Sequence, residues 1–371
     1  MVNLFFYGTL CHLPLLRVVL GREVETTLAI LPDFSVSWVQ DRAFPMIVPQ
    51  AGGTAQGVLL RGLDAQDLAR LDFYTGSYSV QKRQLGVVAA AAPEVATVYF
   101  PDTGVWTAGR PWHIADWAQV WGDTVTATAG DVMALFGLAE ASAIAKRRGA
   151  MLVRGAARVR AAVPGPSALR RRMMAGDVAV QRRSYPYAHF FSAEEYDLSF
   201  RRFDGTMSVL VNRAAFISGD AVTVLPYDPA RDRVLLIEQF RAGPFARGDA
   251  NPWQLEAIAG RIDPGETPEE AARREAVEEA GLQLGDLRPV ANYYPTPGAN
   301  VEFLYSYVAL CDLPDGCAGV FGVAGEAEDI RGHLVSFDVL MDLVASGEAS
   351  NAPLVLTALW LQRERGRLRG L

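Results

Sequence analysis

The segment GRIDPGETPEEAARREAVEEAGL, residues 260–282, decides the fold of the C-terminal half of this chain. Thr267 suits the N-cap of a helix, Pro268 suits the first helical position, and Glu270 completes a capping box. Gly281 suits a left-handed stop at the helix C-terminus. Because local chemistry defines both ends, the segment predicts a helix over residues 268–280.

The predicted helix carries a cluster of carboxylates. Glu275 and Glu279 are four residues apart on one face, and Glu278 is adjacent. Like charges at this spacing destabilise a helix by a few tenths of a kcal/mol per pair, roughly. A divalent cation held among the carboxylates would explain them, because magnesium prefers oxygen ligands. The alternative is a solvated acidic face paired with Arg273 and Arg274.

The spacing of these residues resembles the Nudix box, G-x5-E-x7-R-E-U-x-E-E-x-G-U, with Ala276 as a small residue at the first U position. This resemblance implies hydrolysis of a nucleoside diphosphate linked to another moiety, with Mg²⁺ or Mn²⁺ as cofactor. It also implies roles for individual residues. Glu275, Glu279 and the Ala259 carbonyl would bind metal, Glu278 would support or share a metal, and Arg274 would orient the carboxylates.

The flanking segments resemble the ADP-ribose pyrophosphatase branch of that family over roughly residues 187–365. The matching stretches are LIEQFR (236–241), PWQLEAIAG (252–260), PTPG (295–298) with Glu302, and GEAEDI (325–330). In that branch the last stretch is a mobile loop. Glu326 resembles its general base, which activates the attacking water, and Glu328 resembles an additional metal ligand. The alternative for this stretch is an acidic surface loop.

The same resemblance assigns four residues to the substrate. Arg241 and Arg213 match positions that bind diphosphate, with Arg213 supplied by the partner subunit of a homodimer formed through this domain. Phe191, beside Phe190, falls where an aromatic face for adenine is expected, although a core phenylalanine is an equal alternative. Glu302 would touch the terminal ribose.

Motifs in the N-terminal half include FYGTL (6–10), FPMIV (44–48), GVLL (57–60) and LDFYTG (71–76) with Tyr78. Together they resemble the γ-glutamylcyclotransferase-like (AIG2-like) family over about residues 1–100. That family uses a glutamate base in an L-D-x-Y-E-G motif, where this chain has Thr75. A threonine does not act as a base at neutral pH, so we expect a catalytically silent domain. Its ligand pocket would be formed by Tyr7, Gly8, Thr9, Leu10 and Thr75.

Hydrophobic periodicity places further elements along the chain. It predicts strands at 4–7, 57–60 and 95–100 and a helix at 64–72 with Asp64 as N-cap. It predicts a core-facing helix carrying Trp112, Trp117, Trp121 and Val120, and a second helix over about 140–162. Farther on it predicts strands at 221–227, 233–238 and 301–309 and a final helix over 351–365, with Leu356, Leu359 and Trp360 facing inward.

These elements predict two domains of mixed α/β class. Residues 1–175 would form a small β-barrel with helices, extended by helical segments over about 111–175. Residues 180–371 would form an α/β/α sandwich around a mixed sheet. The fusion resembles proteins described as tellurite-resistance Nudix hydrolases.

Composition excludes several classes of protein. The formal net charge of −7 argues against general nucleic-acid binding. No apolar stretch reaches the roughly 18 residues of a membrane span, and no signal peptide is apparent. The three cysteines predict a reduced, cytoplasmic protein without disulfides. The segment from Lys146 to Arg183, with eleven basic residues and one acidic, is either a docking face or a solvated surface.

The leading hypothesis is therefore a Mg²⁺-dependent pyrophosphatase that splits ADP-ribose into AMP and ribose 5-phosphate. Another nucleoside diphosphate sugar is an alternative substrate. Two hypotheses of other classes are a γ-glutamyl cyclotransferase with an accessory Nudix domain and a non-catalytic nucleotide sensor. Thr75 argues against the first of these, and the retained carboxylates argue against the second.

Overall fold

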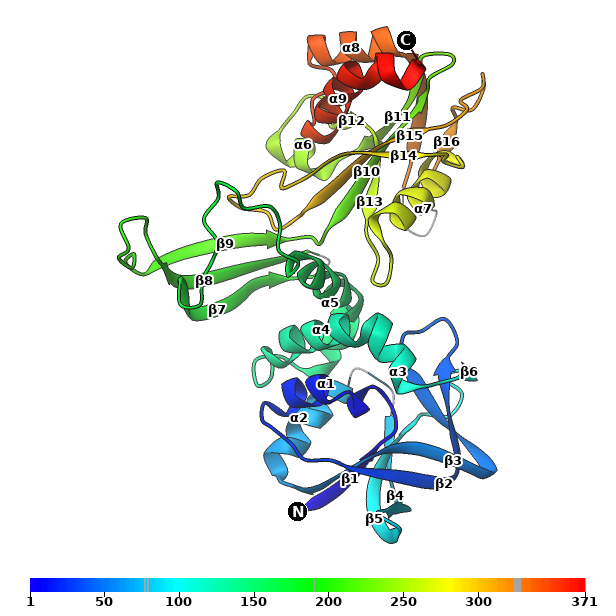
Figure 1. The fold of residues 1–371 in the computed structure, drawn as a ribbon, viewed down its shortest axis with the longest axis vertical. Helices are drawn as coiled ribbons and strands as arrows, with labels where there is room; N and C mark the ends of the chain where they lie inside the picture. Colours follow the sequence, from blue (N-terminus) through cyan, green and yellow to red (C-terminus); the bar gives the residue numbers. More distant parts are fainter. Residues whose placement is uncertain (77, 79, 190, 323–327, 371) are drawn as a thin grey trace. The chain divides into compact units, whose positions relative to one another are not determined.

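The computed structural model describes residues 1–371 except 77, 79, 190, 323–327 and 371, and Figure 1 shows its secondary structure. The chain divides into two units, Met1–Ala168 and Leu169–Leu371, so the first unit ends before residue 175, where the sequence placed the boundary. Among the described residues, no helix combines the length and apolar character needed to span a membrane. All three cysteines are free thiols.

A closed five-stranded barrel forms the body of the N-terminal unit. β3 pairs with both β1 and β2, so the order β3-β1-β5-β4-β2 closes on itself, and a short sixth strand adds to β2. The buried interior includes Phe5, Leu31, Ile47 and Val98. The strands are β1 (Val2–Phe6), β2 (Thr27–Val39), β3 (Pro45–Leu63), β4 (Val80–Ala89), β5 (Ala92–Pro101) and β6 (Ala108–Pro111).

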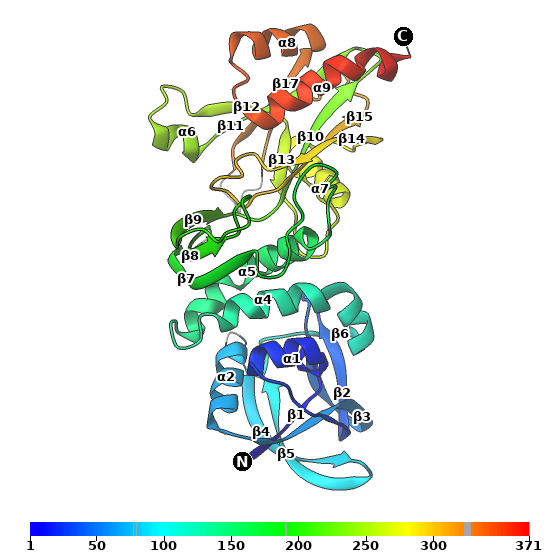
Figure 2. The same ribbon diagram turned by 60° about the vertical axis from the view of Figure 1, so that its left-hand side comes forward.

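Helices flank the barrel on one side in both ribbon views (Figure 2). Asp64 caps α2 and forms a capping box with Asp67, as the sequence predicted for its N-cap. The helical elements are η1 (Thr9–Cys11), α1 (Leu13–Leu20), α2 (Ala65–Thr75), α3 (Ile114–Trp117), a π-helical turn η2 (Ala118–Gly122), α4 (Asp123–Met133) and α5 (Ala141–Ala161).

The predicted single core-facing helix around the tryptophans is wrong in detail. Trp117 is fully buried, but Val120 is 58% exposed. The reason is the π-helical turn η2, which follows α3 and changes the rotation per residue, so the apolar positions do not stay on one face. Trp112 is buried ahead of the helix rather than within it.

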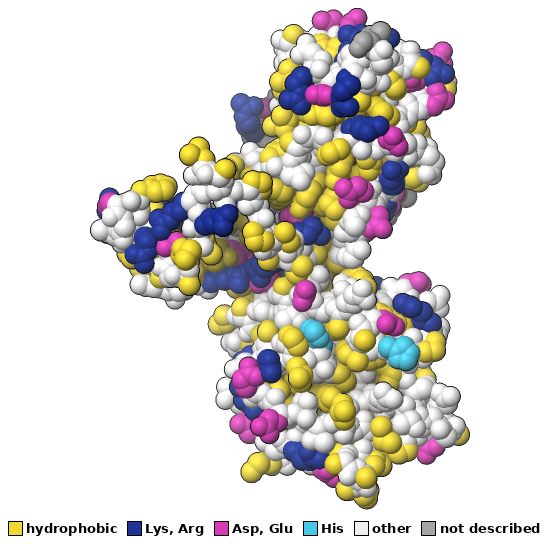
Figure 3. All heavy atoms as spheres, in the orientation of Figure 1, with side chains coloured by type: hydrophobic (Ala, Val, Ile, Leu, Met, Phe, Trp, Pro, Cys, Tyr) yellow, Lys and Arg dark blue, Asp and Glu magenta, His cyan; other side chains and the backbone are white. Residues whose placement is uncertain are grey.

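Much of the positive charge between Lys146 and Arg183 is paired inside the units. In the N-terminal unit, Arg154 and Arg158 both pair with the buried carboxylate of Asp131. In the C-terminal unit, Arg171, Arg182 and Arg183 pair with Asp177, Asp197 and Glu194 respectively. Figure 3 shows basic, acidic and hydrophobic side chains beside one another over β7–β9.

A mixed sheet forms the centre of the C-terminal unit. Its order is β14-β15-β10-β11-β17-β16, with β13 paired to β10 and β12 paired to β11. Only the β10–β15 pair is parallel among these pairings. The strands are β10 (Ala221–Asp228), β11 (Arg233–Phe240), β12 (Trp253–Glu256), β13 (Ile258–Arg261), β14 (Leu287–Tyr293), β15 (Leu304–Leu310), β16 (Val320–Phe321) and β17 (Ile330–Ser336).

Helices cover both faces of this sheet. Alternate residues of the central strands point to opposite sides: Val222 and Val224 join the core with α7, whereas Leu225 and Tyr227 join the core with α8 and α9. The predicted α/β/α sandwich is confirmed. The helices are α6 (Ala242–Arg247), α7 (Pro268–Ala280), α8 (Phe337–Ser346) and α9 (Ala352–Arg369).

Two sequence predictions for this unit need correction. The strand predicted at 301–309 begins at Leu304, because Val301 instead hydrogen-bonds to Phe216 of β9. In α9 the buried positions are Leu354, Thr357, Ala358 and Leu361, whereas the predicted inward residues Leu356 and Leu359 are 37% and 48% exposed. The third predicted residue, Trp360, does pack against the core, so the prediction is wrong only for the two leucines, because α9 carries apolar residues on more than one side.

A separate antiparallel sheet, β7-β8-β9, precedes the sandwich. Its strands are β7 (Val178–Ala188), β8 (Ser192–Phe200) and β9 (Val211–Ile217). The end of β9 is tied to the sandwich through backbone hydrogen bonds between Phe216 and residues 299 and 301.

Candidate active site

The helix α7 positions the candidate site. Thr267 and Glu270 form the predicted capping box, Pro268 opens the helix, and Gly281 adopts the left-handed conformation with φ of 61°. The face of α7 that meets the sheet consists of alanines, including Ala276, which is fully buried. Small side chains let the helix lie close to β10 and β13, and this brings its carboxylates against the backbone of β13.

Gly260 of β13 lies directly against the Glu275 carboxylate. A Cβ atom placed on Gly260 would come within 1.8 Å of Glu275 Oε1 and 2.0 Å of its carboxyl carbon. Real Cβ atoms do not approach other atoms so closely. Any larger residue at this position would therefore displace the Glu275 carboxylate from its place against β13.

We expect Gly260→Ala to lower turnover roughly a hundredfold, because Glu275 must move by more than 1 Å and misplacement of that size has this effect on catalysis. Initial rates of phosphate-ester release would measure the loss. Gly243→Ala is the matched control, because no atom lies within 4 Å of its Cβ position. Equal rates for the two variants would contradict the proposed position of Glu275.

Arg274 organises the acidic side chains. Its Nε and Nη2 atoms donate to the two oxygens of Glu266 at 2.8 and 3.0 Å, and Nη1 donates to Glu275 at 2.7 Å and Glu278 at 2.9 Å. Nη2 also reaches the Arg261 carbonyl at 2.9 Å. The predicted orienting role of Arg274 is consistent with this network. Glu266, present in the motif but given no role from sequence, holds the far end of the guanidinium.

Glu279 is the most buried of the helix carboxylates, with 2% of its surface exposed. Its Oε2 accepts a hydrogen bond from the Ala259 N–H at 3.0 Å. Burial, with added repulsion from Glu275 and Glu328, raises the pKa of Glu279 to about 8. Burial likewise raises the pKa of Glu275 to about 7, with Arg274 opposing and Glu278 and Glu328 adding to the rise.

This donor set fits a divalent cation. The charge of Glu328 contributes to the raised pKa of both Glu275 and Glu279, and a cation among these carboxylates would replace that repulsion with attraction. Among the described residues, no three acidic, histidine or cysteine side chains already have the arrangement of a metal site. Instead, Arg274 holds Glu275 and Glu278, and the Ala259 N–H holds Glu279.

Arg241 lies at the end of β11, facing the same cluster. Its guanidinium makes two hydrogen bonds to Glu256, at 2.9 and 2.6 Å. The charges of Glu279 and Glu328 also act on it. Glu256 was not identified from the sequence, because no local pattern connects it with Arg241. The pairing arises from the register of β11 against β12 and the adjoining turn.

Glu302 is half-buried beside this arginine. Burial is the main cause of its raised pKa, and the charge of Arg241 opposes the rise. Its side chain accepts from Ser218 Oγ at 3.4 Å, and its backbone N–H donates to Asn300 at 3.1 Å. The structure thus brings Glu302 and Arg241 together, as a shared role in substrate binding requires.

The remaining predicted residues are more scattered. Phe191 lies against Phe216, with ring centroids 5.0 Å apart, and both rings are partly exposed at 37% and 43%. Phe216 was missed in the sequence analysis. Arg213 on β9 is exposed and donates only to the neighbouring Asn212 carbonyl among the described residues. Glu326 lies outside the described residues, as does Phe190.

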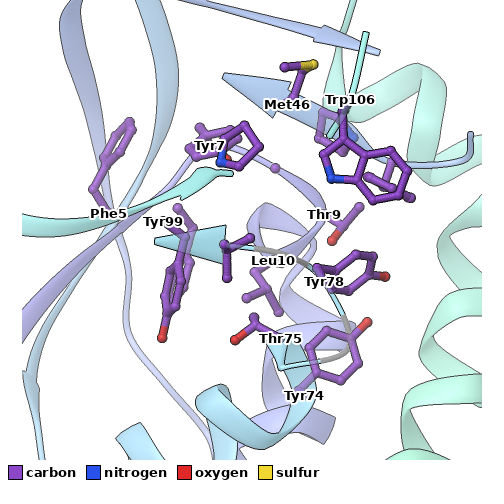
Figure 4. Close-up of a pocket in the computed structure, with 16 residues that line it drawn as sticks. Phe5, Tyr7, Thr9, Leu10, Met46, Tyr74, Thr75, Tyr78, Tyr99 and Trp106 are labelled. Carbon is purple, nitrogen blue, oxygen red and sulfur yellow. The ribbon is translucent and has the colours of Figure 1, made fainter. Parts of the chain in front are cut away.

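The N-terminal unit contains a cavity of about 110 Å³. All five residues predicted for a ligand pocket line it: Tyr7, Gly8, Thr9, Leu10 and Thr75. Figure 4 shows Thr9, Leu10 and Thr75 directed toward the same space, surrounded by aromatic rings. The Thr75 hydroxyl donates to the Leu71 carbonyl of its own helix at 2.7 Å.

Comparisons with known proteins agree with the division of the chain into two units. A model of the NUDIX domain matches residues 218–355, and a model of the gamma-glutamyl cyclotransferase, AIG2-like, family matches residues 4–119. The ADP-ribose pyrophosphatase of Escherichia coli (strain K12) is 40% identical over 193 residues, covering 52% of this chain and 91% of that protein. The ADP-ribose pyrophosphatase of Haemophilus influenzae is 33% identical over 195 residues, covering 52% and 89%. The GDP-mannose pyrophosphatase of Escherichia coli (strain K12 / DH10B) is 28% identical over 174 residues, covering 47% and 89%.

Proposed function

This chain belongs to the Nudix hydrolase family, and from its site geometry we propose that the C-terminal unit hydrolyses the diphosphate bond of ADP-ribose to AMP and ribose 5-phosphate. The observation that carries the proposal is the convergence of Glu275, Glu279 and Glu328 with Arg241 at one end of the central sheet. Carboxylates that can hold a cation, beside an arginine that can hold phosphate, suit a diphosphate substrate.

Each group has a distinct role in this proposal. Glu275, Glu279, Glu328 and the Ala259 carbonyl would hold Mg²⁺, or Mn²⁺ in its place. The bound metal would neutralise charge on the bridging diphosphate oxygens. Arg274 keeps Glu275 and Glu278 in position. Arg241, whose Nε and Nη2 atoms are held by Glu256, would bind the diphosphate through its remaining N–H groups. Phe191 would stack on the base, and Glu302 would bind the terminal ribose.

Product analysis with several substrates tests the proposal directly. ADP-ribose, ADP-glucose, UDP-glucose and GDP-mannose would each be incubated with Mg²⁺ and the full chain. We expect AMP and ribose 5-phosphate from ADP-ribose at a higher kcat/KM than any product of the others. Preferential cleavage of GDP-mannose or UDP-glucose would support diphosphate hydrolysis but contradict ADP-ribose as the preferred substrate. Cleavage of none of the four would contradict the function.

The general base is proposed to be Glu326, on the grounds of its sequence context. We expect Glu326→Gln to lower kcat by roughly a hundredfold or more while KM changes little, because loss of a positioned base affects turnover on that scale. Isothermal titration with substrate and Ca²⁺ would check that binding is retained. Glu348→Gln, at an exposed position of the same unit, is the control. An unchanged kcat would remove Glu326 from the mechanism.

We also propose that the C-terminal unit acts as a homodimer, with Arg213 reaching the diphosphate bound by the partner subunit. The exposed position of Arg213 on β9, away from intramolecular acidic partners among the described residues, is compatible with this role. Mixing an Arg213→Ala chain with a Glu279→Gln chain tests it. Activity regained in the mixture would support a site completed by two chains. If the two variants are shown to form a mixed dimer and that dimer stays inactive, the proposed role of Arg213 would be refuted.

The N-terminal unit is proposed to be catalytically silent. Thr75 cannot accept a proton at neutral pH, and its hydroxyl is already bonded to the Leu71 carbonyl. We therefore expect no 5-oxoproline from γ-glutamyl amines above the rate of buffer alone, measured by chromatography in the same preparation that hydrolyses ADP-ribose. Release of 5-oxoproline would restore the alternative of a γ-glutamyl cyclotransferase with an accessory Nudix domain.

A further inference from the structure

We propose that Gln239 of β11 is a substrate-binding residue, and that its side-chain amide donates a hydrogen bond to a phosphate oxygen held by Arg241. This inference rests on the proposed diphosphate hydrolysis, because it assigns a further residue to the same site. The observation behind it is a buried amide without a partner. Gln239 is 7% exposed, and none of the residues that the structure describes accepts a hydrogen bond from its Nε2 atom.

Strand alternation places Gln239 on the face of the sheet that meets the carboxylate helix. Ile237 packs in the core with α7, whereas Leu236 packs in the core with α8 and α9. Successive residues of a strand point to opposite sides, so Gln239 lies on the α7 side with Ile237. Arg241 keeps an extended backbone, with φ of −125° and ψ of 127°, and its N–H donates to the Pro252 carbonyl at 3.0 Å. The alternation therefore continues to Arg241.

The ion pair between Arg241 and Glu256 crosses the position of Gln239. Glu256 stands opposite Ile237 in the pairing of β11 with β12, and Gln254 stands opposite Gln239. Arg241 and Ile237 are four residues apart, which is about 13 Å along a strand. The hydrogen bonds from Arg241 to Glu256, at 2.9 and 2.6 Å, therefore bridge the level of Gln239. The unpartnered amide thus lies directly beside the arginine that the proposed function assigns to the diphosphate.

The nearby carboxylates are already engaged as acceptors. Both oxygens of Glu256 accept from Arg241, and Glu279 accepts from the Ala259 N–H. Arg241 uses its Nε and Nη2 atoms for Glu256, which leaves Nη1 for another acceptor. Buried side-chain amides are almost always hydrogen-bonded, so one without a partner indicates a functional role. Gln239 Nε2 and Arg241 Nη1 together offer two donors on one face of the sheet.

A phosphate oxygen is the acceptor that suits these two donors. The Arg241 side chain is 39% exposed, so a ligand can reach it from solvent. The charges of Glu279 and Glu328 act on Arg241, so its guanidinium lies beside the carboxylates proposed to hold the metal. A diphosphate at those carboxylates would therefore meet Arg241 first and Gln239 next to it. The glutamine side chain has several rotatable bonds, so its amide can turn toward a bound oxygen while the strand stays in place.

A neutral donor suits this position better than a charged one. A lysine or arginine beside Glu279 and Glu328 would pair with these carboxylates and compete with a divalent cation. The glutamine amide supplies N–H donors without adding a charge. An apolar residue beside Ile237 would be more stable, because a buried donor without an acceptor is destabilising. Gln239 thus lowers stability, as is common for residues placed for function.

Gln239→Met tests this assignment, because methionine has a similar length and adapts to irregular space in a core. Binding of ADP-ribose to the full chain would be measured by isothermal titration in the presence of Ca²⁺. We expect the Kd to rise roughly tenfold or more, the effect of losing one hydrogen bond to a charged group. The urea unfolding midpoint should stay the same or rise. An unchanged Kd would overturn the proposal, and so would weaker binding that is accompanied by a lower unfolding midpoint.

Steady-state kinetics with Mg²⁺ separate binding from the chemical step. We expect the KM of Gln239→Met to rise roughly tenfold while its kcat changes by less than about threefold, because a contact made equally in the ground and transition states affects binding alone. A lower kcat at unchanged KM would place Gln239 in the chemical step and overturn its role in binding.

Gln254→Met is the matched control, because it makes the same substitution at the residue opposite Gln239. The Gln254 Oε1 atom accepts from Ser350 Oγ at 2.8 Å, so this amide is engaged within the protein. Gln254→Met should leave the Kd for ADP-ribose unchanged and lower the unfolding midpoint slightly. If both glutamine variants weakened binding equally, the cause would be a general change in β11 and β12, and the role of Gln239 would be overturned.

A chain carrying Arg241→Lys separates direct donation from support of the arginine. If Gln239 donates to the phosphate itself, Gln239→Met should weaken binding by a similar factor in the Arg241→Lys chain. If Gln239 acts only through the guanidinium, the second substitution should have no further effect on the Kd. That second result would overturn the direct contact.

The parent chain distinguishes failure of this inference from failure of the proposed function. A parent chain that binds none of ADP-ribose, ADP-glucose, UDP-glucose and GDP-mannose would contradict the diphosphate function, and this assignment with it. A parent chain that binds and hydrolyses one of them, beside a Gln239→Met chain that binds it equally well, would overturn only the role of Gln239.

Discussion

Glu279→Gln is expected to lower the rate of the proposed ADP-ribose hydrolysis roughly a thousandfold. The proposed metal contributes several kcal/mol to the transition state, and each 1.4 kcal/mol is a factor of ten in rate. Glutamine keeps an oxygen that can accept the Ala259 N–H, so the fold around the helix is preserved. The loss would therefore report on the missing negative charge. Initial rates over a range of Mg²⁺ concentrations measure it, and half-saturation should require more metal.

The same variant should leave the free energy of unfolding unchanged or increase it. Glu279 is 2% exposed and lies near the charges of Glu275 and Glu328, so a neutral side chain removes both a desolvation cost and a repulsion. Opposite changes in activity and stability are typical of a residue placed for function. Glu269→Gln on the same helix is the control, because Glu269 accepts only the Tyr307 hydroxyl among the described residues. If turnover of Glu279→Gln stayed within tenfold of the parent protein, the assignment of Glu279 as a metal ligand would be contradicted.

Arg274→Ala is expected to reduce both activity and stability. It removes the donors to Glu266, Glu275 and Glu278. These carboxylates then lie beside one another without the positive guanidinium that they share. Breaking a buried ion pair costs about 3 to 5 kcal/mol, and the partial exposure of Arg274 places the expected loss near the lower end. Turnover should fall roughly a hundredfold or more, because the carboxylates lose their positions. Urea denaturation and initial rates would measure the two effects.

Arg273→Ala provides a matched control one residue away. Arg273 donates to the carbonyls of Leu284 and Gly285 and contacts none of the carboxylates among the described residues. Its loss should therefore reduce stability modestly and leave kcat unchanged. Similar kcat values for Arg273→Ala and Arg274→Ala would show that the effect comes from the helix as a whole, and would contradict the orienting role of Arg274.

Local sequence alone was sufficient for the carboxylate helix. Thr267, Glu270 and Gly281 act within a few residues of their own positions, so the bounds of α7 were predicted correctly. The division into a barrel and a sandwich followed from motifs that each lie within a short segment. Predictions were less accurate where a face had to be chosen, as for Leu356 and Leu359 of α9, because an apolar pattern does not state which side meets the core.

The sequence by itself thus determined the Nudix chemistry, since the acidic residues that define it lie within one helix turn of one another and their spacing is visible in the chain. Only the tertiary structure decided which residues from other segments complete the site around that helix. Gly260 meets Glu275, Glu256 holds Arg241, and Ser218 contacts Glu302 because helix packing and strand pairing bring distant segments together. The same holds for Lys82 and Lys146, which share a groove only after the barrel closes beside α5. Contacts of this kind depend on register and packing, which no local pattern encodes.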